Sequence, residues 1–333
     1  MKVLLLMLSP PAANGGMEKH FSDLANGLAN AGVSVSCMSA AEHLQSLDSR
    51  ILRYPVNTNA SRYSVPLIRS IVNAQRRQKF DIIHAQGSKA AATIQPLSAI
   101  LPTPRYIATI HNFKSRYPSP KRFSAIIAVS HALARDIGQS TTVVYNGIRV
   151  DTQKAPPCTL DVCDHPIWLA VGRLVHAKGF DHLIDAFVKV KGTLLIAGDG
   201  EEREPLQKKV EQLRLADRVK LLGYQAQIPR LMQSVDAIVI SSRREGFSYV
   251  CAEALLAGKP IISTDVPVAN ELLPPQHICP IGDIDTLAAL LNTPIPELEE
   301  TQATTRDYAA RELTIDAMIE NTLRVYQEVI RDE

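Results

Sequence analysis

The strongest constraint on the fold is a repeated alternation between short apolar runs and longer amphipathic segments. Runs such as 2–8 have the length and hydrophobicity of buried strands, whereas segments such as 18–31 carry apolar residues at helical spacing. Strands that alternate with helices form βαβ units around a parallel sheet. In the first half the predicted strands are 2–8, 34–38, 82–84, 105–110, 125–129 and 142–145, and the predicted helices are 18–31, 65–77, 90–100 and 131–137.

The alternation stops once and then starts again. Residues 154–164 are polar and contain two prolines, which is typical of a linker. The second half has predicted strands at 167–171, 193–197, 219–222, 237–240 and 261–263, helices at 181–190, 204–213, 228–233 and 249–257, and one long or broken amphipathic helix at 307–330. The fold class is therefore α/β, with two Rossmann-like doubly wound domains whose strand ends are expected to face a shared cleft.

The two halves differ in charge. Residues 1–150 contain 17 Lys and Arg against 6 Asp and Glu, whereas residues 151–333 contain 19 against 28. The basic clusters are Arg69, Arg76, Arg77 and Lys79, then Lys114, Arg116, Lys121 and Arg122, interleaved with Tyr63, Phe80, Phe113, Tyr117 and Phe123. Such a face attracts an anionic membrane surface or a phosphorylated acceptor. The alternative is a solvated surface that docks on the acidic half. No known nucleic-acid motif is present, so no nucleic acid is expected.

Several classes of protein are disfavoured. No apolar run reaches the 18 or so residues of a transmembrane helix, and the apolar run 2–8 is too short for a signal peptide. Five scattered cysteines without a CxxC pair favour a reduced, cytosolic chain. A GxSxG motif is absent, which argues against a hydrolase of that type. Asp283 and Asp285 spell DxD, but Asp283 precedes an apolar helix at 286–291 and is interpreted as its N-cap, so no metal is expected.

Residues 241–258 hold the densest group of candidate functional side chains. A predicted strand leads into Glu245 and the turn Gly246, Phe247 and Ser248, and a helix follows. Backbone N–H groups at the start of such a helix favour an anion such as phosphate. Glu253 lies about one turn inside the helix, and sugar hydroxyls are natural partners for both carboxylates. The alternative is that Glu253 is a solvated helix residue and Glu245 a loop charge.

A second candidate loop follows the first strand of the second half. Gly172, Arg173 and Lys178 lie between strand 167–171 and the next helix. An Arg fork and a Lys point charge beside a helix terminus suit a diphosphate. The alternative is a pair of ordinary surface cations.

Three smaller features follow strand ends. Gly15 and Gly16 open the first helix and allow a ligand close to the backbone, unless they form a plain turn. His111 ends strand 105–110 and can hydrogen-bond a sugar or phosphate, although a lone histidine is more often structural. Gly223 and Tyr224 offer a wall for a nucleobase, or form an ordinary strand end.

With these motifs named, the chain resembles the retaining GT-B glycosyltransferases of family 4 over nearly its whole length. The matching segments are GGMEKH (15–20), TIHN (109–112), AVSHAL (128–133), VVYNGI (143–148), VGRLVHAKGFDHLIDAF (171–187), IAGDGEEREPL (196–206), LLGY (221–224) and SSRREGFSYVCAEALLAGKPIISTD (241–265). The resemblance implies an acceptor-binding domain at 1–155, a donor-binding domain at 156–315 and a helix at 316–333 that crosses back to the first domain.

The resemblance also implies roles for single residues. Arg173 and Lys178 would bind the donor diphosphate, Glu253 the ribose hydroxyls, and Glu245 with the backbone of residues 246–248 the donor sugar and phosphates. His111 would contact the transferred sugar. The implied acceptor-side residues are Gly16, Glu18, His111 and Asn112, with Gly15 and Gly16 also lining the donor phosphate floor. Asn112, Ser241 and Ser248 depart from the usual family residues, which leaves the donor sugar and the acceptor geometry open.

The implied activity is metal-independent transfer of a hexose from a nucleotide-diphosphosugar, expected to be a UDP-sugar, to an envelope glycan or glycolipid such as lipopolysaccharide, with retention of anomeric configuration. We expect a cytoplasmic enzyme without a cofactor, held peripherally at the inner face of the cytoplasmic membrane. Two alternatives stay open: a sugar-nucleotide epimerase on the same scaffold, and a non-catalytic nucleotide-sugar-binding subunit.

Overall fold

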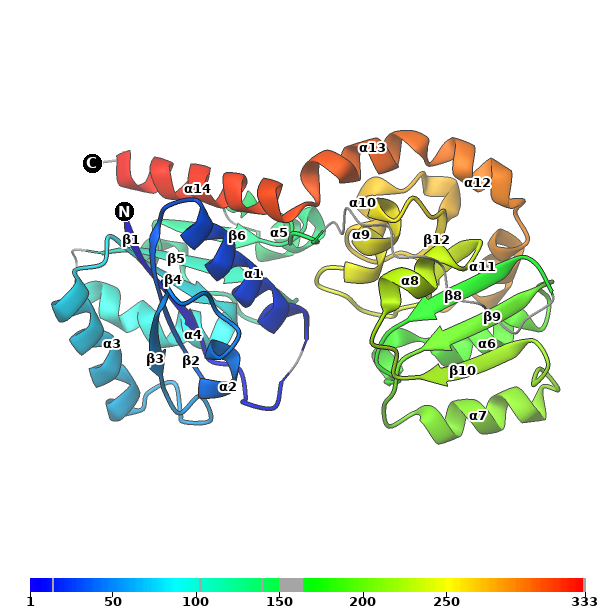
Figure 1. The fold of residues 1–333 in the computed structure, drawn as a ribbon, viewed down its shortest axis with the longest axis horizontal. Helices are drawn as coiled ribbons and strands as arrows, with labels where there is room; N and C mark the ends of the chain where they lie inside the picture. Colours follow the sequence, from blue (N-terminus) through cyan, green and yellow to red (C-terminus); the bar gives the residue numbers. More distant parts are fainter. Residues whose placement is uncertain (14, 102–103, 139, 150–163, 332–333) are drawn as a thin grey trace. The chain divides into compact units, whose positions relative to one another are not determined.

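The computed structural model describes residues 1–13, 15–101, 104–138, 140–149 and 164–331, and its chain divides into two units. Unit 1 comprises Met1–Arg149 and Leu313–Glu333, and unit 2 comprises Val150–Glu312 (Figure 1). The predicted linker at 154–164, except Asp164, and the predicted boundary at 155 lie outside the described residues.

Unit 1 is built on a seven-stranded parallel sheet in the order β3-β2-β1-β4-β5-β6-β7. Its strands are β1 (Lys2–Met7), β2 (Ser34–Ser39), β3 (Leu52–Pro55), β4 (Ile82–Gln86), β5 (Arg105–Ile110), β6 (Ala125–Ala128) and β7 (Thr142–Val143). Its α-helices are α1 (Gly16–Asn30), α2 (Ala41–Leu44), α3 (Val65–Gln78), α4 (Gly87–Ile94), α5 (His131–Ile137) and α14 (Ile315–Arg331), and its 3₁₀ turns are η1 (Gln95–Ala99) and η2 (Pro120–Arg122).

Two predictions for unit 1 need correction, and one strand was not predicted. The helix predicted at 90–100 begins earlier and its α-helical part ends at Ile94, because Pro96 lacks the N–H that would continue the helix. The strand predicted at 142–145 covers only two residues. Sequence reasoning missed β3, which is an edge strand with largely exposed side chains and therefore has no apolar run to reveal it.

Unit 2 has a six-stranded parallel sheet in the order β10-β9-β8-β11-β12-β13. Its strands are β8 (Ile167–Val171), β9 (Thr193–Ala197), β10 (Val219–Gly223), β11 (Ala237–Ile240), β12 (Ile261–Thr264) and β13 (Ile278–Cys279). Its α-helices are α6 (Phe180–Phe187), α7 (Arg203–Gln212), α8 (Ile228–Gln233), α9 (Tyr249–Leu256), α10 (Ala269–Leu272), α11 (Ile284–Leu291), α12 (Ile295–Thr301) and α13 (Ala303–Glu312), and its 3₁₀ turns are η3 (His176–Lys178) and η4 (Pro275–His277).

Both sheets thus have the doubly wound order in which the chain starts in the middle, runs to one edge and returns to the other side of its first strand. The sequence-based prediction of two Rossmann-like domains is confirmed. The amphipathic segment predicted at 307–330 is broken, with α13 in unit 2 and α14 in unit 1.

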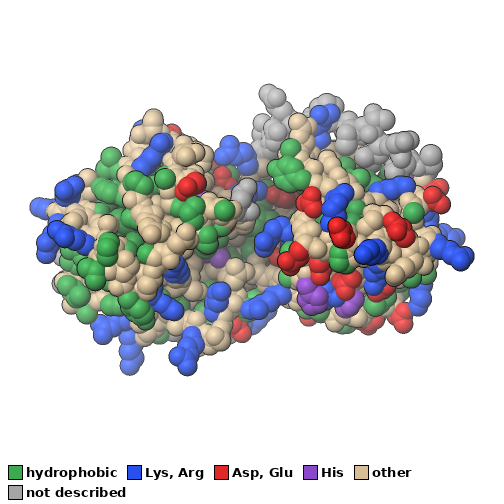
Figure 2. Space-filling model, turned by 90° about the horizontal axis from the view of Figure 1, so that it is seen from below, with side chains coloured by type: hydrophobic (Ala, Val, Ile, Leu, Met, Phe, Trp, Pro, Cys, Tyr) green, Lys and Arg blue, Asp and Glu red, His purple; other side chains and the backbone are tan. Residues whose placement is uncertain are grey.

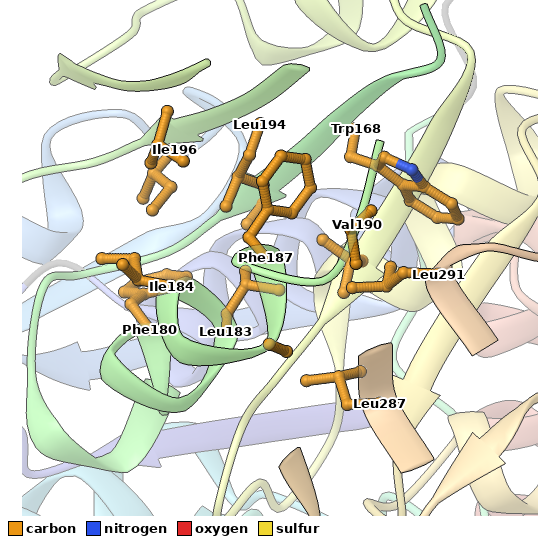
Figure 3. Packing of buried hydrophobic residues seen from close by; sticks show 14 of the residues in the cluster. Trp168, Phe180, Leu183, Ile184, Phe187, Val190, Leu194, Ile196, Leu287 and Leu291 are labelled. Atoms are coloured by element: carbon orange, nitrogen blue, oxygen red, sulfur yellow. The ribbon is translucent and has the colours of Figure 1, made fainter. Parts of the chain in front are cut away.

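The core of unit 2 follows from the period of two along its strands. Alternate residues Trp168 and Ala170 of β8 join Leu194 and Ile196 of β9 in one buried cluster. Figure 3 shows how Phe187 and other apolar side chains of α6 point toward these strands. The packing anchors β8 and α6, and the loop that joins them carries Arg173 and Lys178.

The core of unit 1 is completed by a helix from the far end of the chain. Met318, Ile319, Val325, Tyr326 and Val329 of α14 are buried in the same cluster as the apolar residues of α1, β1 and β2. Figure 1 shows α14 in red beside α1 in blue. The entry to α14 is fixed by backbone hydrogen bonds from Ile148 N to Leu313 O and from Ile315 N to Ile148 O, at 2.8 and 3.3 Å.

Gly147 controls this entry, because an added Cβ would lie 2.5 Å from Cα and 2.9 Å from N of Ile315. We predict that Gly147→Ala weakens the packing of α14 and lowers the free energy of unfolding by about 1–3 kcal/mol. Hydrogen exchange measures this as faster exchange along α14.

The control is Gly32→Ala, which meets no heavy atom within 4 Å and costs about 1 kcal/mol through its left-handed backbone alone, at φ 82°. It should leave exchange along α14 unchanged. Equal protection of α14 in both variants would contradict the role assigned to Gly147.

Candidate functional site

The candidate site of unit 2 lies where its sheet changes direction. β8 and β11 are neighbours, and the chain leaves β8 toward one edge of the sheet and returns through β11 toward the other. Loops that follow two such strands leave a crevice at their carboxyl ends, where open α/β sheets bind ligands. The two loops here are 172–179 and 241–248, which contain Gly172, Arg173, Lys178, Glu245 and residues 246–248 of the predicted donor site.

An ion pair joins these two loops. Lys178 Nζ lies 2.5 Å from Glu245 Oε1, and Ser242 Oγ donates to the same carboxylate oxygen at 2.8 Å. The Lys178 and Glu245 side chains are 22% and 13% exposed, so both are largely shielded but still reachable from solvent. The sequence suggested that both residues bind a donor, but it did not predict that they bind each other.

The close approach of the two loops depends on Gly179. Its backbone is left-handed at φ 64°, and an added Cβ would lie 2.1 Å from Ser241 O. Ser241 Oγ in turn donates to Lys178 O at 2.9 Å. The segment before α6 is therefore seated directly on the end of β11, which places Lys178 opposite Glu245.

Arg243 fastens the same two segments from the other side. Its guanidinium donates to both carboxylate oxygens of Asp181, at 2.8 and 2.7 Å, and to His176 O at 2.7 Å. Partial burial alone would raise the pKa of Asp181, but the hydrogen bonds and charge of Arg243 outweigh it and lower that pKa. Asp181 is thus ionised at neutral pH, and its bidentate pair with Arg243 holds the loop in place.

Arg173 differs from Lys178 in its surroundings. Its side chain is exposed and has no hydrogen bond or ion pair with any residue the structure describes. The backbone beside it is held, because Leu174 N donates to Asp199 O and Glu202 N donates to Leu174 O, both at 2.9 Å. The loop after β8 therefore carries an exposed cation on a backbone that hydrogen bonds hold in place.

Strand β10, which is separated from β8 by β9, carries the predicted nucleobase wall at its carboxyl end. Gly198 N donates to Gly223 O at 2.8 Å, which ties the ends of β9 and β10 together. Tyr224 follows directly and is 77% exposed. An aromatic ring this exposed is available for stacking, but its predicted contact with a base stays a prediction.

The start of α9 shows what Ser248 does in this chain. Ser248 is the N-cap, and its Oγ accepts a hydrogen bond from Cys251 N at 3.4 Å. The residue is buried, as are Gly246 and Phe247. Ser248 therefore caps the start of α9. Glu253 lies partly buried in α9.

Unit 1 has a comparable site at the switch between β1 and β4. Gly15 is the N-cap of α1 and Gly16 its first residue. The Glu18 carboxylate is used locally, since Gly15 N donates to Oε2 at 2.9 Å and Ser9 Oγ donates to Oε1. This geometry gives Glu18 a role in shaping the turn before α1, whereas its predicted acceptor contact stays a prediction.

His111 is buried, at 7% exposure, and Asn112 next to it is exposed. The His111 ring makes an edge-to-face contact with His20 at 4.8 Å between centroids. Burial lowers the pKa of His20 to about 4 and holds the pKa of His111 well below its ordinary value, so both rings are neutral at neutral pH. Nδ1 of His111 lacks a hydrogen-bond partner among the described residues, and the Asn146 side chain lies beside the His20 ring.

Sequence reasoning missed the polar residues that surround His111. His84, Gln86, Thr109, Asn146 and His20 are all buried in unit 1. A signal was present in β4, where His84 and Gln86 alternate with apolar residues in a strand that is buried throughout. Polar side chains repeated on one face of a buried strand indicate either a hydrogen-bond network or a ligand site.

The interpretation of Asp283 as an N-cap is confirmed. Its carboxylate accepts hydrogen bonds from N and Oγ1 of Thr286, at 3.0 and 2.7 Å, at the start of α11. Across the described ranges, no group of three or more His, Cys, Asp or Glu side chains is placed to hold a metal ion. Of the five cysteines, the three in the described part, Cys37, Cys251 and Cys279, are free and buried.

The site residues thus fall into two groups, one in each unit. Unit 2 brings together Lys178, Glu245 and the loops that carry Arg173 and Ser248. Unit 1 places His111 against His20 of α1, the helix that Gly15 and Gly16 open. No helix in the described part of the chain is both long and apolar enough to span a membrane.

Two family models match the chain. Residues 161–311 match the model of "Glycosyl transferases group 1", and residues 14–152 match that of "Glycosyltransferase Family 4". Together they cover both units, including the loops that carry Lys178, Glu245 and His111.

Among similar proteins, the lipopolysaccharide core biosynthesis glycosyltransferase LpsE of Rhizobium meliloti is 27% identical over 75% of this chain and 76% of its own length. The 2-deoxystreptamine glucosyltransferase of Streptomyces kanamyceticus is 25% identical over 79% of this chain and 81% of its own.

The solved structure of Anabaena HepE in complex with UDP superposes with a TM-score of 0.84 at 23% identity, covering 98% of this chain and 100% of that one. At this identity the likeness concerns the fold. The chain belongs to the group 1 glycosyltransferases, a family of transferase enzymes with the GT-B fold.

Proposed function

We propose that this enzyme transfers a hexose from a nucleotide-diphosphosugar, with UDP as the nucleotide, to a cell-envelope glycan or glycolipid, with retention of anomeric configuration. The observation that carries the proposal is the ion pair between Lys178 and Glu245 at the switch point of unit 2. It places one cation and one carboxylate side by side where open α/β sheets bind ligands.

The two charges of the pair fit the two ends of such a donor. A diphosphate carries more negative charge than a carboxylate and is an alternative partner for Lys178. Its arrival releases Glu245, whose oxygens then accept hydrogen bonds from sugar hydroxyls. The exposed guanidinium of Arg173 adds a second cation for the phosphate oxygens. Donor binding thus exchanges an internal ion pair for two ligand contacts.

The chemical step follows from this charge distribution. The bond between sugar C1 and the diphosphate oxygen breaks, and the acceptor oxygen forms its bond to C1 on the same face. The acceptor proton passes to the departing phosphate oxygen, so no enzyme carboxylate is needed as a nucleophile. Lys178 and Arg173 stabilise the negative charge that develops on the leaving group, which is the service a metal ion provides elsewhere.

The donor and acceptor classes are proposed from the relatives. LpsE and LpsD of Rhizobium meliloti are named as lipopolysaccharide core glycosyltransferases, and LpsD is 36% identical over 40% of this chain and 40% of its own length. The HepE structure named above was solved with UDP. We therefore propose a UDP-sugar donor and a lipopolysaccharide-type acceptor.

A membrane-bound acceptor agrees with the surface of unit 1. Figure 2 shows basic side chains spread over the face of unit 1 in view, with few acidic ones among them. Arg69, Arg76 and Arg77 are exposed on α3, and Tyr63 just before it is 68% exposed. The predicted aromatic interleaving is only partly at the surface, because Phe80 and Phe123 are buried in the core. We propose peripheral binding to anionic lipid at the cytoplasmic face of the membrane.

We predict that Lys178→Ala lowers kcat/KM for a UDP-sugar on the order of 100-fold, because the leaving diphosphate loses a close cation. The matched control is Lys189→Ala, which removes a lysine from an exposed pair with Asp285 and should change kcat/KM little. Product formation on a lipopolysaccharide core acceptor measures both. Equal activity of the two variants would refute the role of Lys178.

The same assay, run with EDTA, tests metal independence. We expect full turnover in the presence of the chelator, because Lys178 and Arg173 supply the positive charge. Loss of turnover that is restored by a divalent cation would overturn this part of the mechanism.

Incubation with the donor alone distinguishes the epimerase alternative, which would convert one nucleotide-sugar into another without an acceptor.

We also predict that the protein binds vesicles containing anionic lipid and that binding weakens as salt rises. Reversing the charge of Arg76 and Arg77 to Glu should reduce binding by at least the order of tenfold. The matched control reverses Lys191 and Lys208, which are exposed on unit 2. Equal retention on neutral and anionic vesicles would contradict the proposal.

A further inference from the structure

A chain of hydrogen bonds inside unit 1 leads from α14 to His111. Tyr326 Oη lies 2.7 Å from His84 Nδ1, and His84 Nε2 lies 3.2 Å from Gln86 Nε2 and 2.7 Å from Thr109 Oγ1. Gln86 Oε1 lies 2.9 Å from His111 Nε2. Each of these side chains is buried, so none can satisfy its polar groups with bulk water.

The partners fix which nitrogen of each ring carries the proton. Gln86 Oε1 can only accept, so His111 Nε2 must donate to it. Gln86 Nε2 can only donate, so His84 Nε2 must accept. The single N–H of neutral His84 is then on Nδ1, and it donates a hydrogen bond to Tyr326 Oη. The bonds run in one direction, from His111 through Gln86 and His84 to Tyr326.

His111 stays neutral in this setting. Burial is the main cause that holds its pKa well below the ordinary value, and the nearby rings of His20 and His84 act in the same direction. A neutral ring with its proton on Nε2 has a bare lone pair on Nδ1. That Nδ1 atom is buried and has no partner among the described residues.

We propose that His84 and Gln86 are positioning residues that hold His111 in its Nε2–H tautomer, with Tyr326 of α14 as their anchor, so that Nδ1 accepts a hydrogen bond from a ligand hydroxyl. The identity of this hydroxyl rests on the proposed function, in which the ligand is the transferred sugar. The tautomer itself is a property of the free protein.

The tautomer decides what His111 can bind. A bare Nδ1 accepts a hydrogen bond from a hydroxyl but repels a phosphate oxygen, whereas an Nδ1–H would donate to a phosphate oxygen or to a hydroxyl oxygen. The ring therefore suits a sugar and not the diphosphate. Leaving a buried acceptor without a partner destabilises the free protein, and this cost is recovered when a hydroxyl donates to Nδ1.

The opposite arrangement is the competing hypothesis. If the Gln86 amide were turned by half a revolution, every bond of the chain would reverse, and His111 would carry its proton on Nδ1. Turning the amide keeps the same shape, so the two arrangements differ in their protons and in little else. A measurement that locates the protons is therefore decisive.

The experiment is a two-bond ¹H–¹⁵N correlation spectrum of the full chain labelled with ¹⁵N-histidine, without ligand. The His111 signals are assigned by their loss in His111→Asn. We expect the pattern of a neutral ring with a bare Nδ1 and a protonated Nε2. A protonated Nδ1 in the unaltered protein would overturn the proposal, whether or not the protein transfers a sugar.

Variants of Gln86 test whether it sets the tautomer. In Gln86→Leu we expect His111 to become a mixture of tautomers and kcat to fall on the order of tenfold, the effect of one lost hydrogen bond. Gln86→Glu keeps an acceptor facing His111 and should retain the Nε2–H form. Conversion to Nδ1–H in Gln86→Glu, or an unchanged tautomer in Gln86→Leu, would contradict the positioning role.

The matched control is Gln75→Leu, which removes a buried glutamine of unit 1 that bonds both N and O of Phe80 near the start of β4. It should lower stability and leave the His111 tautomer unchanged.

Tyr326→Phe removes the hydroxyl that accepts a hydrogen bond from His84. We expect it to give a mixture of His111 tautomers, as Gln86→Leu does. If Gln75→Leu changed the proportion of His111 tautomers as much as Gln86→Leu does, the effect would be one of general packing. That result would refute the positioning role of Gln86 and His84.

Discussion

The contact between the loops after β8 and β11 is the constraint on which the candidate donor site depends. Gly179 lets one backbone rest on the other, Ser241 bonds across the junction, and Arg243 fastens the outer side to Asp181. These contacts hold the two loops together, and Lys178 and Glu245 form their ion pair across the junction. The two charges are therefore paired in the free protein, and the proposed function gives each of them a new partner when a donor binds.

The two units share the doubly wound fold but differ in the charge of their candidate site residues. Each has a parallel sheet with a switch point, and each has candidate site residues in segments that follow strands beside it. Unit 2 offers cations, which match phosphate oxygens, and unit 1 offers buried neutral histidines, which match hydroxyls. The difference follows from solvent access, because Lys178 keeps some contact with water while burial around His111 disfavours any charge.

Most of the fold was predictable from the sequence, because buried parallel strands such as 167–171 and 237–240 are continuous apolar runs with clear ends. The exposed edge strand β3 left no such signal, and Pro96 changed a helix that periodicity alone extended to residue 100. Lys178 and Glu245 were predicted as site residues because charged side chains follow the ends of two predicted strands. Their mutual ion pair and the network from Tyr326 to His84 were not predictable, because both join residues distant in sequence.

The most direct test of the account is a crystal structure of the protein with a bound UDP-sugar. The account predicts that Lys178 Nζ leaves Glu245 and contacts a phosphate oxygen, while the Glu245 carboxylate accepts hydrogen bonds from sugar hydroxyls. An intact ion pair between Lys178 and Glu245, with the diphosphate bound elsewhere, would contradict it.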